Sequence, residues 1–354
     1  MAAKATPGAG KNENFIRNVF YASLIVVGVV ALAALVWQAA HYLLLFFAGI
    51  LLAILLDAIA SGIGSIAPLP RPARLLIAVL IVAAAFGAIG FVIPSVIAQA
   101  PELARYLQEW LEWFRANVMT LEPVRETLEN GQSEELVQLL PSPGELLGGA
   151  AAIVGGTISI LTGAVLIVIF GLYLAAEPSR YYEQGIAEFT PGLRQKLAAT
   201  GADIGMVLRR WLLAQILMML LIGFSSYAVL TALGVPLALM LSFIAGMTAF
   251  IPFVGPLIGG SAMVLVAATK DPWLGLIVIG FYIGLQLVES NLLTPLIQSR
   301  AIFVPPAIVI LAQVILGVLF GALGIALATP LAAVIAVIVK RHFLGRPVGA
   351  EQAG

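Results

Sequence analysis

The stretch between Arg210 and Lys340 carries only four charged side chains, namely Lys270, Asp271, Glu289 and Arg300. A bilayer core of about 30 Å is crossed by roughly 20 apolar residues, so a stretch of this length could cross several times. The whole chain is 61% hydrophobic and 10% charged, whereas an average soluble domain has roughly 25% charged residues. The sequence therefore predicts an all-α polytopic membrane protein with seven to eight hydrophobic passes.

The composition argues against several classes of function. The chain contains no cysteine, which removes disulfides and thiolate chemistry, and its only histidines are His41 and His342. Its net charge is zero, so no basic field would attract nucleic acid. The sequence shows no cluster of a nucleophile and a base that would indicate an enzyme. We therefore expect no catalytic residues, no cofactor, no metal and no nucleic-acid partner.

The N-terminal part of the chain is expected to cross the membrane three times. Residues 1–14 are small and polar and are predicted to be disordered, and residues 15–98 hold three spans, with an uncharged turn at residues 37–40 between the first two. Lysine and arginine in short loops mark the cytoplasmic side of a membrane. The basic loop at residues 68–74, the N-terminus and the C-terminal tail at 341–354 are therefore predicted to be cytoplasmic.

An acidic segment at residues 99–148 separates the third predicted span from the fourth, at 149–175. Its first part has apolar residues at three- and four-residue spacing, which is typical of an amphipathic helix. Because it follows an odd number of spans, it is expected to face outward. It could cap the membrane surface or contact a partner or another subunit of a homo-oligomer. Residues 176–210 are predicted to form cytoplasmic helices, divided at Pro191.

The membrane-embedded core is predicted at residues 211–340, where two segments are too long for single spans. Residues 235–268 would measure about 50 Å as one helix, far more than a membrane requires, and residues 304–339 pose the same problem. The segments match at an offset of 69 residues, which aligns Val235, Pro236 and Gly255 with Val304, Pro305 and Gly324. We expect an inverted repeat of one span plus one re-entrant hairpin. The alternative is two long tilted helices that share Pro and Gly by chance.

Ionisable groups at membrane depth are costly, so Glu289 is the strongest candidate for a functional site. The predicted pathway for a solute or an ion consists of Glu289, Gln286, Ser290, Asn291, Thr294 and Gln313. Carboxylate, amide and freed carbonyl groups suit a proton, a cation or a polyhydroxylated ligand. The alternative is a polar helix end at the cytoplasmic interface, with Glu289 solvated or paired with Arg300. Asp57 is expected to be interfacial, with a coupling role as its alternative.

Helix breakers at membrane depth survive only where protein or a water-filled cavity satisfies the freed backbone groups. The candidates for hairpin breaks or gating positions are Pro252, Gly255, Pro256, Pro295, Pro305, Pro306, Gly321, Gly324 and Pro330. This density of breakers favours a transporter or a channel over a simple anchor.

Several of these positions resemble motifs of the AI-2E family, also called the autoinducer-2 exporter family. The residues that carry the resemblance are Ile251-Pro252-Phe253-Val254-Gly255-Pro256, Gln286, Glu289, Pro295, Pro305-Pro306 and Phe320-Gly321-Ala322-Leu323-Gly324 with Pro330. The resemblance implies a protein of the bacterial inner membrane that exports small molecules, and some relatives act as sodium(lithium)/proton antiporters. Residues 298–302 depart from the family, which often has a glycine near the start of this loop.

Three functions are compatible with the sequence. The first is a secondary transporter that exports a small polar, largely uncharged solute, with autoinducer-2 as the family's example. No Walker motif is present, so the energy would come from a gradient. The second is a sodium(lithium)/proton antiporter centred on Glu289, with H+ or Na+ as its partner ion. The third is a membrane scaffold whose outer segment recruits partners.

Overall fold

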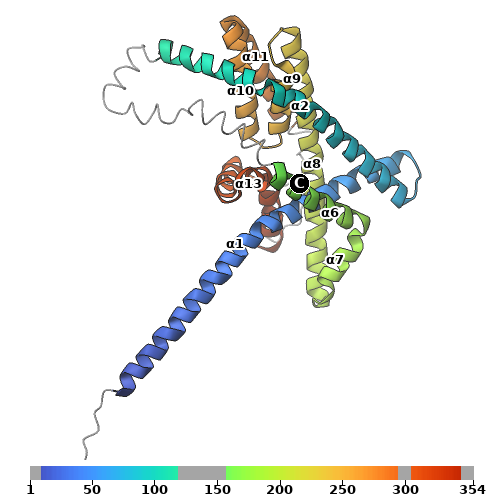
Figure 1. Ribbon diagram of the computed structural model, residues 1–354. Coiled ribbons are helices and arrows are strands. Elements are labelled where there is room, and N and C mark those ends of the chain that lie inside the picture. The colour runs from blue at the N-terminus through green and yellow to red at the C-terminus, as the bar shows by residue number, and fades with distance from the viewer. Residues whose placement is uncertain (1–8, 119–156, 294–303, 344–354) are drawn as a thin grey trace, which may run out of the picture.

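The computed structural model describes residues 9–118, 157–293 and 304–343. Every regular element in these ranges is a helix, so the predicted all-α fold is confirmed (Figure 1). By length and composition, five of the described helices could cross a membrane, or six if one bent pair forms a single span. The chain is therefore polytopic, and the expected seven to eight passes stay a prediction.

Helix α1 (Ala9–Ile66) is one helix of 58 residues where two spans joined by a turn are expected. The predicted turn at residues 37–40 is wrong, because these residues include neither Gly nor Pro and continue the helix. Residues 9–14, which are predicted to be disordered, form the first turns of α1, whereas residues 1–8 lie outside the described residues. The N-terminal part of α1 projects from the rest of the molecule (Figure 1).

Helix α2 (Arg71–Val118) joins the third predicted span to the beginning of the acidic segment without interruption. Pro94 and Pro101 lie inside this helix, where each removes one backbone donor without ending it. The rest of the acidic segment, residues 119–148, lies outside the described residues. The helix expected at the start of that segment is thus present and continuous with the span.

Three helices follow in the middle of the chain. They are α6 (Thr157–Ala176), α7 (Pro178–Ala187) and α8 (Pro191–Ala232). The predicted division at Pro191 is confirmed, since proline suits the first turn of a helix and α8 begins there. α8 runs from the predicted cytoplasmic region through the predicted fifth span, and its 42 residues measure about 63 Å. The later helices α9 and α13 pack against α8.

The segment after α8 forms a first helical hairpin. Its arms are α9 (Ala238–Thr248) and α10 (Val254–Lys270), and the chain reverses between them at residues 249–253. At about 16 and 25 Å, neither arm spans a bilayer core of about 30 Å. The arms pack closely, because a Cβ added to Gly259 would lie 2.6 Å from Cα of Ala245. The amine of Lys270 donates to the carbonyl of Gly234, so the two ends of the hairpin meet.

A second hairpin follows α11 (Pro272–Val288) and the π-helix η2 (Glu289–Leu293). It is formed by α13 (Pro306–His342), which breaks at Gly321, where φ is 62° and ψ is −144°. The arms on either side of Gly321 fold back on each other, since Val304, just before the first arm, packs against Ala333 and Val337 of the second. The structure therefore describes this segment as two arms that meet at Gly321.

The breaks lie slightly before the glycines that mark them in the sequence. The first hairpin reverses at residues 249–253, which include the candidate break Pro252, and the second at the candidate break Gly321, rather than at Gly255 and Gly324. Gly255 and Gly324 instead lie in the first turn of each second arm. The positive φ of Gly321 explains this shift, because glycine adopts that conformation without the strain that a Cβ would cause.

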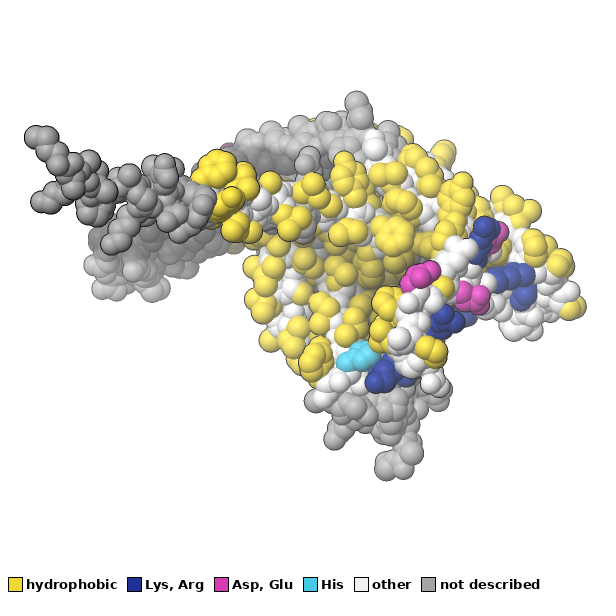
Figure 2. Space-filling view, turned by 90° about the horizontal axis from the view of Figure 1, so that it is seen from below, with side chains coloured by type: hydrophobic (Ala, Val, Ile, Leu, Met, Phe, Trp, Pro, Cys, Tyr) yellow, Lys and Arg dark blue, Asp and Glu magenta, His cyan; other side chains and the backbone are white. Residues whose placement is uncertain are grey.

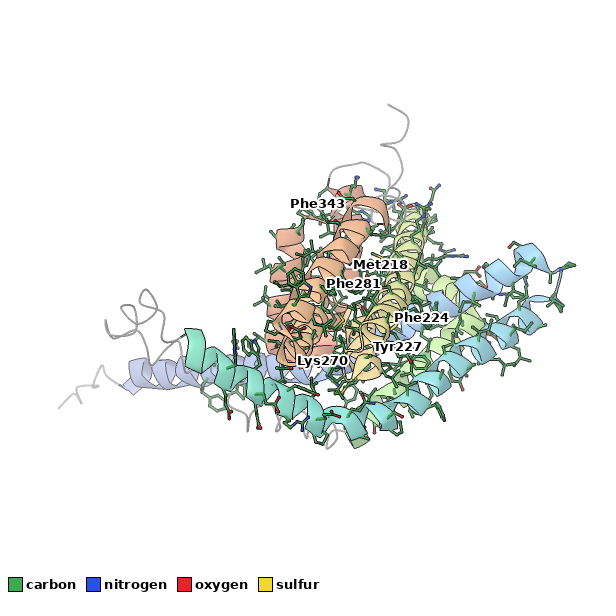
Figure 3. The ribbon with its side chains drawn as sticks, turned by 90° about the horizontal axis from the view of Figure 1, so that it is seen from above. Met218, Phe224, Tyr227, Lys270, Phe281 and Phe343 are labelled. Atoms are coloured by element: carbon green, nitrogen blue, oxygen red, sulfur yellow. The ribbon has the colours of Figure 1, made fainter. Side chains whose placement is uncertain are left out.

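The two hairpins enter the core from opposite ends of α8. Lys270, at the end of the first hairpin, contacts Gly234 beyond the C-terminus of α8. Arg341, at the end of the second, forms an ion pair with Asp203 in the N-terminal part of α8. Figure 3 accordingly shows Lys270 and Phe343 at opposite ends of the helical core. This is the geometry expected for an inverted repeat.

The described surface is largely hydrophobic. In the view of Figure 2, the basic, acidic and histidine side chains gather in one region, and hydrophobic side chains cover most of the remaining described surface. Every candidate span carries several exposed large hydrophobic side chains. A lipid environment suits such a surface, because apolar side chains are stable against acyl chains and not against water.

Candidate functional site

The tip of the first hairpin, residues 249–253, has a strained backbone conformation at Phe253. The last carbonyl groups of α9 lack the partners that a continuing helix would supply. Phe253 has a φ of 66°, a conformation that is uncommon for a residue with a large side chain. Such strain costs about 1–3 kcal/mol and persists only where the surrounding structure enforces it. Neighbouring helices must therefore hold this tip in place.

Three side chains from three helices donate hydrogen bonds to backbone carbonyls, two of them at this tip and the third in the first turn of α10. The pairs are Gln215 of α8 with Ala249, Gln313 Nε2 of α13 with Pro252 at 2.9 Å, and Tyr282 Oη of α11 with Pro256 at 3.1 Å. A buried carbonyl group that loses its partner costs about 1–3 kcal/mol. These donors therefore fix the break relative to α8, α11 and the second hairpin.

The tip of the second hairpin reaches the same place. Phe250 from the first tip and Phe320 and Leu323 from the second belong to one hydrophobic cluster with Trp211 and Leu212. The rings of Trp211 and Phe250 pack edge to face, with their centroids 5.6 Å apart. Because Trp211 is at the midpoint of α8, the two tips converge halfway along that helix.

Gly255 and Gly324 play the same part in the two hairpins. A Cβ on Gly255 would overlap the carbonyl oxygen of Thr248, and a Cβ on Gly324 would overlap that of Leu316. In both cases the carbonyl group belongs to the end of the first arm, so the glycine lets the second arm fold tightly against it. The 69-residue match in the sequence therefore corresponds to one local geometry that occurs twice.

Gln313 is the predicted pathway residue that contacts the first tip, and it lies about two turns before Gly321 in the first arm of the second hairpin. Its side chain is only 3% exposed, and its Nε2 atom donates to Pro252. Its Oε1 atom is buried and has no hydrogen-bond partner among the described residues. Since a buried acceptor without a partner is costly, this oxygen is suited to accept a hydrogen bond from a bound molecule.

Glu289 and its neighbours lie farther along α11. Gln286 and Glu289 share a helix face with Tyr282, and they lie about one and two turns beyond the level of the first tip. Both side chains are half-buried. Glu289 begins η2, and π-helical turns are frequent at functional sites.

The remaining predicted pathway residues are peripheral or undescribed. Ser290 and Asn291 are exposed, and both donate to the carbonyl of Leu287. Thr294 and Pro295 lie outside the described residues. Among the other predicted breakers, Pro305 and Pro306 mark the start of α13, and Pro330 is buried inside its second arm.

Asp57 belongs to a different group, at the junction of α1, α2 and α8. Its carboxylate lies 3.8 Å from Arg71 and 3.9 Å from Arg209. All three side chains are between 39% and 48% exposed. This environment favours the interfacial interpretation of Asp57 over a coupling role. Within the described part of the chain, no group of three or more His, Asp and Glu side chains could hold a metal ion.

Sequence reasoning missed two of the three tip donors. Gln215 could have been found, because an amide inside an apolar span is costly and is usually paired. Tyr282 gave no comparable signal, since tyrosine is common in membrane proteins near the interfaces.

Comparison with known proteins gives the relatives of this chain. It matches the family described as "AI-2E family transporter" over residues 25–343. Three similar proteins carry the name "Putative transport protein". MT0215 of Mycobacterium tuberculosis (strain CDC 1551 / Oshkosh) is 29% identical over 69% of this chain and 67% of its own length. YrrI and YueF of Bacillus subtilis (strain 168) are each 25% identical, over 78% and 71% of this chain and 79% and 66% of their own lengths.

The family match covers both hairpins and the helices that hold their tips, as well as most of α1 and all of α2. With a match of this extent, the chain belongs to the AI-2E family of membrane transporters.

Proposed function

We propose that this protein is a gradient-driven secondary transporter that exports a small polar, largely uncharged solute of the autoinducer-2 type. The observation that carries the proposal is the hydrogen bond from Gln313 to Pro252, which joins the two hairpins beside the middle of α8. In secondary transporters built from inverted repeats, the substrate site lies where the broken helices of the two repeats meet. The tip region is therefore the proposed substrate site, with Gln313 as its central polar group.

The residues at the tips favour an uncharged solute. Residues 249–253 and 320–323 include no charged side chain, so the tips themselves offer a permanently charged molecule no partner to offset its desolvation. A hydroxyl group of the solute could donate to Oε1 of Gln313. The aromatic rings of Phe250 and Trp211 would pack against its carbon skeleton.

The charge distribution supports an orientation with the C-terminus in the cytoplasm of a bacterial cell, in its inner membrane. The N-terminal half of α8 carries Arg194, Lys196, Arg209 and Arg210. At the C-terminal end of α8, the loop around Lys270 has one lysine, and the next residue is the oppositely charged Asp271. Excess lysine and arginine mark the cytoplasmic side. On this assignment the first hairpin enters from outside and the second from inside.

A sodium(lithium)/proton antiporter is the second candidate, and the position of Glu289 favours it. This half-buried carboxylate begins a π-helix on the same face of α11 as the tip donor Tyr282. A carboxylate that alternates between ionised and protonated forms could couple proton movement to a cation or to the solute.

Flux measurements on the purified protein in vesicles separate these candidates. The transporter predicts efflux of a small polyhydroxylated solute without ATP, whereas the antiporter predicts a change in vesicle pH on addition of sodium or lithium without any organic solute. A scaffold predicts neither flux. In that case, deletion of residues 101–148 should abolish the cellular phenotype while Glu289 could be replaced without effect.

Replacement of Glu289 by glutamine is expected to leave the protein folded and to remove the dependence of transport on pH or on a cation gradient. Glutamine keeps the hydrogen-bonding shape of the side chain but cannot exchange a proton, whereas Glu289→Asp should be partly active. The measurement is the efflux rate of reconstituted variants across a pH series. Glu183→Gln, which changes an exposed carboxylate of α7, is the matched control. An unchanged rate and pH profile in Glu289→Gln would show that Glu289 is a solvated interfacial charge.

A further inference from the structure

The arms of the second hairpin leave an elongated groove of about 390 Å³ between them. Ile308, Ala312 and Leu316 line one wall, and Ala328, Ala332 and Ala336 line the other. Each set follows a spacing of four residues and therefore forms one ridge along its arm. The alanines on the second arm are too small to fill the space between the ridges, so the groove follows the hairpin along its length.

The groove is apolar except at one end. Among the described residues that line it, Lys340 is the one with a charged side chain, and it lies in the basic last turn of α13. Rim residues such as Ile308 and Ile335 are 51% and 60% exposed, so the groove opens to the surface rather than into the interior. A molecule that is apolar over most of its length and negatively charged at one end would match this lining.

The dimensions match one leaflet of a bilayer. From Ala328 to Lys340 the groove follows twelve residues of helix, or about 18 Å. Half of a hydrocarbon core of about 30 Å is roughly 15 Å. An acyl chain that begins at the level of Lys340 would end near Ala328. A polar solute would find almost no hydrogen-bonding partner in this apolar lining.

We propose that this groove binds one acyl chain of an anionic phospholipid, whose phosphate group lies against the amine of Lys340. The acyl chain fills the space between the two arms of the second hairpin and sets the distance between them. The interaction goes beyond the proposed transport function and does not depend on which solute is carried.

Native mass spectrometry of the full-length protein in mild detergent tests this proposal, with added phosphatidylglycerol or phosphatidylcholine of identical acyl chains. The wild type should retain phosphatidylglycerol more strongly by about fivefold, the scale expected for one lysine near an anionic headgroup. Lys340→Gln should remove the headgroup preference, and Ala336→Phe should reduce retention of both lipids by filling the groove.

Two control variants distinguish this groove from general lipid binding. Lys270→Gln removes a lysine at the other end of the core, and Val318→Phe adds an aromatic ring at a position of the same hairpin that is 82% exposed and outside the groove. Both should behave as the wild type. Equal retention of the two lipids by the wild type, or an unchanged preference in Lys340→Gln, would overturn the proposal even if Ala336→Phe folds poorly. A disulfide between two copies carrying Ala336→Cys would overturn it as well, since a second copy would then occupy the groove.

Discussion

Alanine at Gly255 or at Gly324 is expected to lower the rate of solute transport by about tenfold or more. The added methyl group would overlap the carbonyl oxygen of Thr248 or of Leu316, so the second arm must move away from the first. Overpacking of this kind costs about 1–3 kcal/mol, and here it would displace the tip that Gln313 holds through Pro252. Leucine should be more harmful than alanine at both positions. Initial efflux rates from vesicles, with expression and thermal unfolding measured in parallel, give the result.

Gly280 provides the matched control, because it lies in α11 and a Cβ added there would meet no atom within 4 Å. Gly280→Ala should keep the wild-type rate and add helix propensity of up to about 1 kcal/mol. Loss of transport in Gly255→Ala but not in Gly280→Ala would locate the effect at the hairpin. Unaltered efflux by a well-expressed Gly255→Leu variant would show instead that this break lies outside the transport pathway.

Replacement of Arg341 by glutamine is expected to destabilise the protein by about 3 kcal/mol, because it breaks a largely buried ion pair. The side chains of Arg341 and Asp203 are 24% and 14% exposed, and Arg341 also donates to the carbonyl of Ala199 at 2.9 Å. The neighbouring His342 lies 3.1 Å from the hydroxyl of Thr200. Together these contacts fasten the second arm of the second hairpin to α8. The free energy of unfolding in mixed detergent reports the change.

The double variant Asp203→Asn with Arg341→Gln should be less destabilised than the sum of the single variants, because it leaves no unpaired charge. Glu177→Gln is the control, since Glu177 and Arg180 form a pair at 2.8 Å with side chains 54% and 65% exposed. Removal of such an exposed pair should change stability little. Strict additivity of the Asp203 and Arg341 variants would contradict an interaction between them.

The hairpins could be predicted from the sequence because two physical signals coincide there. An apolar segment longer than a membrane requires must be tilted, bent or folded back, and Gly255 and Gly324 supply the missing side chain at the positions where the arms touch. Pro252 and Gly321 were among the candidate breaks, but the sequence could not single them out from the other candidates. Phe253 adopts a positive φ that its side chain disfavours, and only the packing around the tip enforces it.

The long first helix could not be predicted for a related reason. Two apolar runs separated by Trp37 and Gln38 suggest two spans, but a short polar interruption without Gly or Pro does not end a helix. At the candidate site, Gln313 was predictable as a polar group in an apolar hairpin. Its partner was not, because Pro252 is 61 residues away in the chain and the contact exists only once both hairpins have folded.

The accessibility of residues 270 and 300 tests the central claim most directly, namely that the two hairpins enter the membrane from opposite sides. Arg300 lies outside the described residues, but Val304 packs beside Val337 near the end of the second hairpin, far along α8 from Lys270. The chain has no cysteine, so Lys270→Cys and Arg300→Cys can each be labelled with an impermeant thiol reagent applied to intact cells. The inverted hairpins predict labelling at 270 and protection at 300 until the membrane is opened. Labelling at 300 with protection at 270 would contradict them and indicate eight plain spans.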